Sequence, residues 1–116
     1  MKKIFIITGE YSGDKHASGI AREIFKTNPD VSIEAVGGSN LEAAGVKLFC
    51  NHEKMSAMGL SLKIIIDHIT LGKKVADYLI NDYKPDLVLL VDYGGFNLNI
   101  AKVLKKAGLK ISVSYT

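Results

Sequence analysis

The clearest fold signal in this chain is the stretch Ile4-Phe-Ile-Ile-Thr-Gly-Glu-Tyr-Ser-Gly-Asp-Lys-His-Ala-Ser-Gly19. Residues 4–8 favour β-structure and run into a glycine-containing turn, after which a helical pattern begins at once. Apolar residues then recur at the spacing of one helix face: Ala17, Ile20, Ala21, Ile24 and Phe25. The pattern predicts a buried strand that delivers a short polar loop to the start of a helix. In open α/β sheets, ligands bind at such strand ends.

The loop after this strand does not have the spacing of a known phosphate-binding motif. Its glycines, at positions 9, 13 and 19, do not fit Gly-x-Gly-x-x-Gly, and Glu10 and Asp14 would repel a pyrophosphate. No Gly-Lys-Ser/Thr follows, so a Walker A loop is excluded as well. Ser12 or Asp14 is expected to cap the helix, and a capping residue can also face a ligand.

Length and composition indicate one globular domain. The 116 residues are 47% apolar and 23% charged, as in ordinary soluble proteins. The net charge of +3 is compatible with anionic ligands or a membrane surface. The lysines are scattered and form no basic stripe with aromatic residues, so no nucleic-acid partner is expected. No apolar run approaches the ~20 residues of a spanning helix, and we expect a cytoplasmic protein in which Cys50 is buried.

The rest of the chain alternates between strand and helix patterns. Further strands are predicted at 31–36, 46–49, 87–91 and 110–115, and helices at 40–44, 61–82 and 98–107. This alternation predicts a Rossmann-like α/β fold, with a parallel five-stranded sheet and helices on both faces. Because the first and fourth strands are the most hydrophobic, we place them centrally and expect the strand order 3-2-1-4-5.

In this order the switch point falls between strands one and four, so residues 10–14 and 92–97 should meet at one edge. Asp92 directly follows the fourth strand, and Gly94 and Gly95 open the backbone beside it. A carboxylate there can act as general base for a substrate hydroxyl, or it can bind backbone donors of the neighbouring turn. Asn97 is expected to cap the helix that follows. Neither zinc-ligand spacing nor an Asp-x-Asp pair is present, so no metal is expected.

The front of the 61–82 helix region is unusually apolar. Seven large apolar residues lie within residues 55–66 and occupy more than one helical face. They suit packing against the core or a further part of the protein, and they also suit contact with acyl chains or a bilayer.

Several motifs resemble the lipid-A-disaccharide synthase family. They are Gly9-Glu10-x-Ser12-Gly13-Asp14 after the first strand, Gly37-Gly38 after the second, Met58-Gly59, Lys84-Pro85-Asp86, and Asp92-x-x-x-Phe96-Asn97. They occur in the family's order along essentially the whole chain. The first is a specific signal, whereas Gly-Gly and Lys-Pro-Asp alone are weak.

The resemblance implies an inverting GT-B-type glycosyltransferase without a cofactor. Such an enzyme joins UDP-2,3-diacylglucosamine to 2,3-diacylglucosamine 1-phosphate, releases UDP, and is a peripheral protein at the cytoplasmic face of the inner membrane. It also implies that Asp92 is the base and that residues 55–66 hold acyl chains. Substrate-binding roles are expected for Glu10, Ser12, Gly13, Asp14, Met58 and Asn97.

The chain departs from the family pattern in three places. It has the length of the front part of an amino-terminal, acceptor-side domain, without the carboxy-terminal UDP-sugar domain. Gly95 stands where the family has a second carboxylate, and Leu62 replaces a glutamate that follows Met-Gly. A divergent homologue fits these departures. The alternative is a stand-alone flavodoxin-like or nucleotide-binding regulatory module without catalysis.

Overall fold

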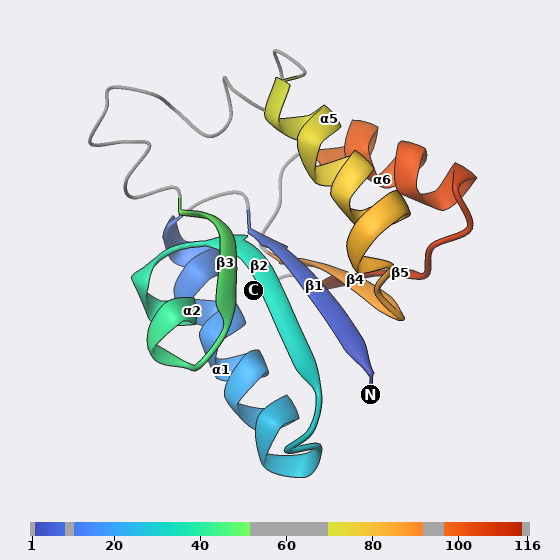
Figure 1. Ribbon diagram of the computed structural model, residues 1–116. Coiled ribbons are helices and arrows are strands. Elements are labelled where there is room, and N and C mark those ends of the chain that lie inside the picture. Colours follow the sequence, from blue (N-terminus) through green and yellow to red (C-terminus); the bar gives the residue numbers. More distant parts are fainter. Residues whose placement is uncertain (1, 9–10, 52–69, 92–96, 115–116) are drawn as a thin grey trace.

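The computed structural model describes residues 2–8, 11–51, 70–91 and 97–114. Within them, five parallel strands form one sheet in the order β3-β2-β1-β4-β5, which confirms the predicted fold class and strand order (Figure 1). Strand β4 has the predicted ends, and the ends of the other strands differ from the predicted ones by at most two residues. The strands are β1 (Lys3–Thr8), β2 (Ser32–Gly37), β3 (Lys47–Asn51), β4 (Leu87–Val91) and β5 (Ile111–Ser114).

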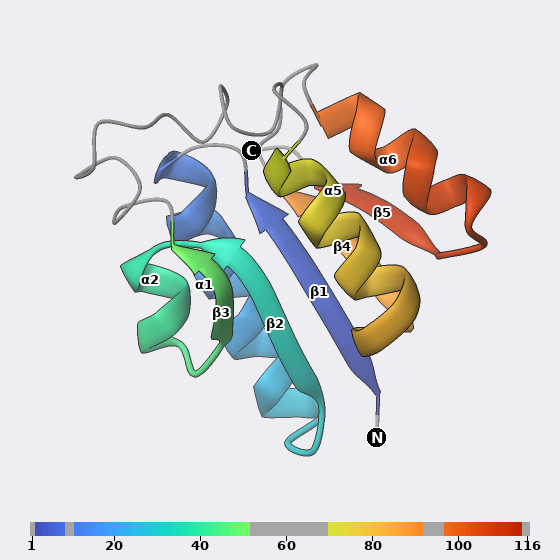
Figure 2. The ribbon, with the colours of Figure 1, turned by 45° about the horizontal axis from the view of Figure 1, so that its top comes forward.

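Helices cover both faces of this sheet. One face carries α1 (Tyr11–Thr27) and α2 (Ser39–Ala43), and the other carries α5 (Thr70–Asp77), the π-helix η1 (Tyr78–Tyr83) and α6 (Asn97–Lys106) (Figures 1 and 2). Right-handed crossovers explain this division, because the chain moves outward from β1 to β3 and then crosses to β4 and β5 on the other side.

The central strand β1 is buried on both faces. Each residue from Phe5 to Thr8 is at most 1% exposed. Alternate side chains point to opposite faces, so Phe5 and Ile7 pack beneath α5 and η1, while Ile6 packs on α1. A near-continuous apolar strand is typical of a parallel sheet with helices on both sides.

Two apolar clusters hold the layers together. The first lies between the sheet and α5, η1 and α6, and its buried members are Phe5, Ile7, Val36, Val75, Ala76, Leu79, Tyr83, Val88, Leu90 and Leu104. The second lies between the sheet and α1 and α2, and comprises Ile6, Ala17, Ala21, Val31, Ile33, Ala35, Leu41, Val46, Leu89 and Val91. The sheet therefore has a core on each face.

The edge strand β3 contains an irregularity next to Cys50. Ala35 pairs with Leu48 but Val36 pairs with Cys50, so the register shifts between them. Phe49 and Cys50 consequently both pack against the first cluster. Cys50 is half-buried and not fully buried as we expected. This partial burial raises the pKa of its thiol.

The predicted helix 61–82 is present from Thr70, and residues 61–69 lie outside the described part. Its last turns are π-helical rather than α-helical. The backbone N–H of Lys84 donates to the carbonyl of Leu79 (3.0 Å), five residues back, and Lys84 has a φ of 50°. This wide turn allows the rings of Tyr78 and Tyr83 to stack, with centroids 5.8 Å apart. Sequence periodicity does not distinguish the two helix types here.

Helices α2 and α6 end at Ala43 and Lys106, one residue before the predicted ends, and the start of α6 is shifted by one residue as well. Gly45 and Gly108 follow α2 and α6 with φ values of 95° and 87°, a conformation that favours glycine. Helix α6 starts at Asn97 itself, so Asn97 lies in its first turn and not before it. No helix in the described ranges is both long and apolar enough to cross a bilayer.

Candidate functional site

The carboxyl ends of β1, β2 and β4 lie at the same edge of the sheet. Thr8 pairs with Val91, and Ile7 pairs with Val36, so the three strands end in register. The hydroxyl of Thr8, a fully buried residue, donates a 2.9 Å hydrogen bond to the carbonyl of Val36. The stretches that follow these strands therefore leave from one edge, as the predicted switch point requires.

Asp14 lies in the first turn of α1 at this edge and is 0% exposed. Its Oδ1 accepts hydrogen bonds from the backbone N–H groups of Gly38 (2.8 Å) and Leu41 (3.2 Å), and its Oδ2 accepts one from Asn40 (3.0 Å). These N–H groups belong to the start of α2, which has no partner for them within the helix. Asp14 therefore caps α2 from a distance of 24 residues or more along the chain.

This geometry corrects two predictions about helix starts. Helix α1 begins at Tyr11, so Ser12 and Asp14 lie inside its first turn and not at its cap. The helix predicted to begin at residue 40 begins at Ser39, and Gly38 occupies its N-cap. The carboxylate that binds the free N–H groups comes from another helix.

Gly37 leaves space for the side chain of Leu41 beside this carboxylate. A Cβ added at Gly37 would lie 2.3 Å from Cδ1 of Leu41 and 3.3 Å from Oδ1 of Asp14. Because Leu41 is itself 0% exposed, its methyl group has little room to move away. Position 37 therefore requires glycine, because the side chain of Leu41 and the carboxylate of Asp14 approach its Cα closely.

The described residues test the predicted site only in part. The structure brings the carboxylate of Asp14 against Gly37 and Gly38, and Gly13 beside it in the sequence is buried. Ser12 and Asn97 are placed as helix residues near the amino ends of α1 and α6, without a description of their side chains. The predictions for Glu10, Met58 and Asp92 fall outside the described residues.

Sequence reasoning missed a polar and aromatic cluster on the other face of the sheet. The hydroxyl of Tyr78 donates to Oε1 of Glu34 (2.5 Å), and that of Tyr83 donates to the carbonyl of Ser32 (2.9 Å). Phe5 contacts both tyrosine rings edge-on. Glu34, a charged residue between Ile33 and Ala35 in β2, is a signal in the sequence that could have indicated a polar partner on this face.

Burial and nearby negative charge perturb both tyrosines. Desolvation, followed by the hydrogen bond to Glu34 and the negative charge of that carboxylate, raises the pKa of Tyr78 to about 12. Desolvation also raises the pKa of Tyr83, although a hydrogen bond with the side-chain hydroxyl of Ser32 acts in the opposite direction. Both phenols are therefore neutral at physiological pH.

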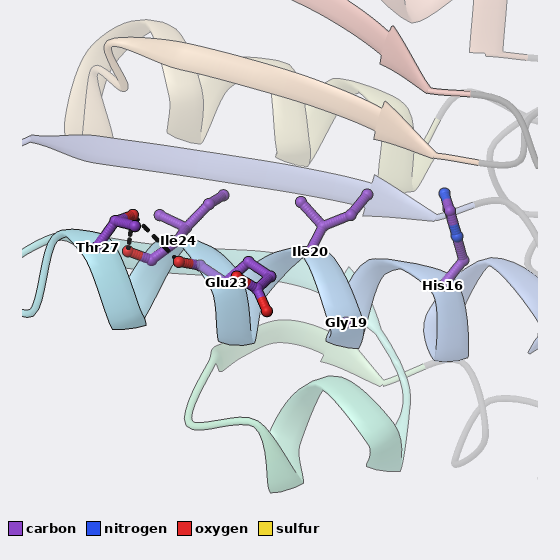
Figure 3. Close-up of a pocket in the computed structure, with 6 residues that line it drawn as sticks. All are labelled: His16, Gly19, Ile20, Glu23, Ile24 and Thr27. Atoms are coloured by element: carbon purple, nitrogen blue, oxygen red, sulfur yellow. Dashed lines mark hydrogen bonds between the residues drawn. The ribbon is translucent and has the colours of Figure 1, made fainter.

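Two grooves are lined by described residues outside the predicted site. One, of about 530 Å³, runs along α1 and is lined by His16, Gly19, Ile20, Glu23, Ile24 and Thr27 (Figure 3). The other, of about 680 Å³, lies near the starts of β4 and β5 and is lined by Leu87, Ala101, Lys102, Lys105, Leu109, Lys110 and Ile111. Neither groove contains a predicted site residue. Among the described residues, no group of three His, Cys, Asp or Glu side chains could hold a metal ion.

Solved structures with a similar fold come from proteins of different kinds. A carboxy-terminal domain of a hydrogenase from Pyrococcus furiosus matches with a TM-score of 0.65 and 20% identity, over 97% of this chain and 90% of that domain. Saccharopine dehydrogenase from Saccharomyces cerevisiae matches with a TM-score of 0.53 and 17% identity, over 100% of this chain and 22% of that enzyme. At these identities the likeness shows an α/β fold alone.

Sequence relatives identify the family. The chain is 36% identical to lipid-A-disaccharide synthase of Geobacter metallireducens over 112 residues, and 38% identical to lipid-A-disaccharide synthase 1 of Legionella pneumophila strain Lens over 113 residues. These matches cover 95% and 94% of this chain but 29% of each relative, so the chain spans less than a third of their length. The family model described as lipid-A-disaccharide synthetase matches residues 4–116. This chain therefore belongs to the lipid-A-disaccharide synthetase family.

Proposed function

We propose that this chain is the acceptor-side part of the amino-terminal domain of a GT-B-type lipid-A-disaccharide synthase. The observation that carries the proposal is the family match over residues 4–116, combined with a parallel sheet whose motif-bearing strand ends share one edge. The enzyme would transfer 2,3-diacylglucosamine from its UDP derivative to 2,3-diacylglucosamine 1-phosphate. Relatives are more than three times as long as this chain, and we assign UDP-sugar binding to the remaining part of the enzyme.

Asp92 is the proposed general base of this reaction. It directly follows Val91, the last residue of β4, whose register partner is Thr8 of β1. The carboxylate takes the proton from the primary hydroxyl of the acceptor as that oxygen forms a bond to the anomeric carbon of the donor sugar. The bond from that carbon to UDP breaks with its electron pair, so UDP leaves and attack from the opposite face inverts the configuration.

The acceptor side is assigned to residues near the same strand ends. Glu10, Ser12 and Gly13 belong to the motif after β1, and Asn97 is the first residue of α6. Met58 belongs to the apolar segment for which we propose contact with acyl chains. Without the donor part, the 116-residue chain should transfer no sugar, because the developing charge on UDP lacks a preorganised partner.

Peripheral attachment to the cytoplasmic face of the inner membrane is part of the proposal. Residues 93–116 contain four lysines and no acidic residue, so the positive net charge of the chain is concentrated there. Lys102, Lys105 and Lys106 are exposed on α6. Beside them, the hydrophobic side chain of Val103 is 49% exposed. Basic side chains beside exposed apolar surface suit an anionic bilayer.

The test is a transfer assay with the complete enzyme and the two proposed substrates. We expect UDP and the acylated disaccharide phosphate to appear together, in equal amounts, as followed by mass spectrometry. A reaction without the acceptor is the control. Release of UDP without disaccharide, or no reaction of the folded enzyme, would contradict the proposal and favour a module without catalysis.

A further inference from the structure

We propose that Asp14 is a positioning residue, which fixes the first turn of α1 to the start of α2 and does not itself touch a substrate. The effect of this contact on the rate of sugar transfer rests on the function proposed above. The hydrogen bonds and the burial on which the inference rests are independent of that function.

The carboxylate of Asp14 already accepts hydrogen bonds from the backbone. Both of its oxygens accept backbone hydrogen bonds, at 2.8, 3.0 and 3.2 Å, and the residue is 0% exposed. An ionised carboxylate has about four acceptor positions, and three are used by N–H groups at the start of α2. Because Asp14 is 0% exposed, a substrate hydroxyl could reach the remaining position only after the segments that cover the carboxylate moved away.

Gly37 is the second half of the same arrangement. A Cβ at position 37 would clash with the Leu41 side chain, at 2.3 Å from its Cδ1, and would also lie tightly against Oδ1 of Asp14, at 3.3 Å. Leu41 also donates its backbone N–H to Asp14, so the three residues restrain one another. The Gly-Asp at positions 13–14 and the Gly-Gly at 37–38 therefore form one unit, although each is a separate motif in the sequence.

A second hydrogen bond holds Thr8, the residue that directly precedes the motif after β1. The Thr8 hydroxyl donates to the carbonyl of Val36, next to Gly37, and Thr8 is 0% exposed. Thr8 and Asp14, which flank Glu10 and Ser12 in the sequence, are thus held to the end of β2 and to the start of α2. Holding reactive groups in a fixed geometry accelerates a reaction without direct contact to the substrate.

The anchoring itself is tested by amide hydrogen exchange on the 116-residue chain. In Asp14→Asn, we expect exchange at Gly38, Asn40 and Leu41 to become roughly tenfold faster or more, because a charged acceptor is lost. Gly37→Ala should have a similar effect without altering the carboxylate. Glu42→Gln is the matched control, because it removes a charge from the first turn of α2 at an exposed position. Unchanged exchange in both Asp14→Asn and Gly37→Ala would overturn the inference.

The role in transfer is tested by steady-state kinetics of the complete enzyme. We expect Asp14→Asn and Gly37→Ala to lower kcat by similar factors, roughly tenfold or more, with acceptor KM changed less than about threefold. The double variant should lose less than the product of the two factors, since both changes disrupt one unit. Turnover is referred to the folded fraction, measured by circular dichroism.

Each remaining outcome gives a clear decision. If Asp14→Asn raises the acceptor KM about tenfold while Gly37→Ala leaves it unchanged, then Asp14 contacts the acceptor and the inference is wrong. If the wild-type enzyme transfers no sugar but the exchange results hold, the proposed function fails while the anchoring stands. If Asp14→Asn does not fold, Gly37→Ala still tests both statements by exchange and by kinetics.

Discussion

The hydroxyl of Tyr78 in η1 donates a 2.5 Å hydrogen bond to Oε1 of Glu34 on β2. This bond joins the π-helix to strand β2. Phe49 of β3 lies against the same ring, with centroids 4.9 Å apart. The tyrosine is held neutral by burial and by the carboxylate it binds, which together raise its pKa. Protonation of this side chain is therefore coupled to folding.

This coupling predicts a loss of stability at alkaline pH. The unfolded chain loses the phenolic proton of Tyr78 near the ordinary pKa of 10, whereas the folded chain keeps it up to a pKa of about 12. The stabilisation is complete below pH 10 and is lost as the pH rises toward 12. Tyr78→Phe has no proton to lose, so its unfolding free energy should fall less steeply in this window. Urea unfolding at intervals between about pH 9 and pH 12 measures the unfolding free energy of both proteins. If it falls with pH equally steeply in the wild-type chain and in Tyr78→Phe, the prediction is contradicted.

Truncation of Phe5 should destabilise the chain strongly. Phe5 is 0% exposed and contacts the rings of Phe49, Tyr78 and Tyr83. Phe5→Ala should cost about 3–5 kcal/mol of unfolding free energy, because it leaves a cavity in the core. The control is Val103→Ala, at a 49% exposed position, with an expected change within about 0.5 kcal/mol. Denaturant unfolding of the two variants tests the difference.

The proposed base can be tested in the complete enzyme. Asp92→Asn keeps the shape of the side chain but removes its basicity, so kcat should fall about 10²–10⁴-fold, or ~3–5 kcal/mol of transition-state stabilisation. Donor binding should be nearly unchanged. Turnover and melting temperature are measured on the same preparation. A variant that melts early yet turns over normally would show that Asp92 is structural and that the base lies elsewhere.

The 116-residue chain should bind UDP poorly. In our proposal the donor site belongs to another part of the enzyme, so isothermal titration of UDP into the chain should give no saturable heat at micromolar concentrations. The complete enzyme is the positive control. Tight binding of UDP to residues 1–116 would overturn the two-domain assignment.

The basic surface of α6 should direct attachment to anionic lipid. The chain is expected to co-sediment with vesicles of phosphatidylglycerol and phosphatidylcholine at low salt, and less in about 0.5 M salt. Lys102→Glu combined with Lys105→Glu should reduce binding roughly tenfold or more, since each basic residue near such a surface contributes about 1 kcal/mol. Lys26→Glu combined with Lys47→Glu changes the net charge equally at exposed sites elsewhere. If both double variants lose vesicle binding equally, the surface of α6 has no specific role in attachment.

The architecture follows from the sequence alone. Residues 4–7 and 87–91 are apolar without interruption, which indicates strands buried on both faces, and their alternation with helical patterns leaves few topologies. The observed order β3-β2-β1-β4-β5 confirms this prediction. Hydrophobic periodicity and crossover handedness are local rules, and for that reason they can be applied without coordinates. The motifs at residues 9–14 and 92–97 indicate the family in the same way, because they are read from residue type and spacing.

The groups that the polar side chains bind depend, in contrast, on the tertiary structure. Asp14 caps α2 and not its own helix, because the parallel pairing of β1 and β2 brings the start of α2 beside the first turn of α1. Tyr78 binds Glu34 because a π-helical turn and the sheet register place them together across 44 residues. A buried carboxylate must satisfy its acceptors, but the sequence does not state which N–H groups lie within about 3 Å. That choice depends on the packing of segments far apart in the chain, which local sequence rules do not describe.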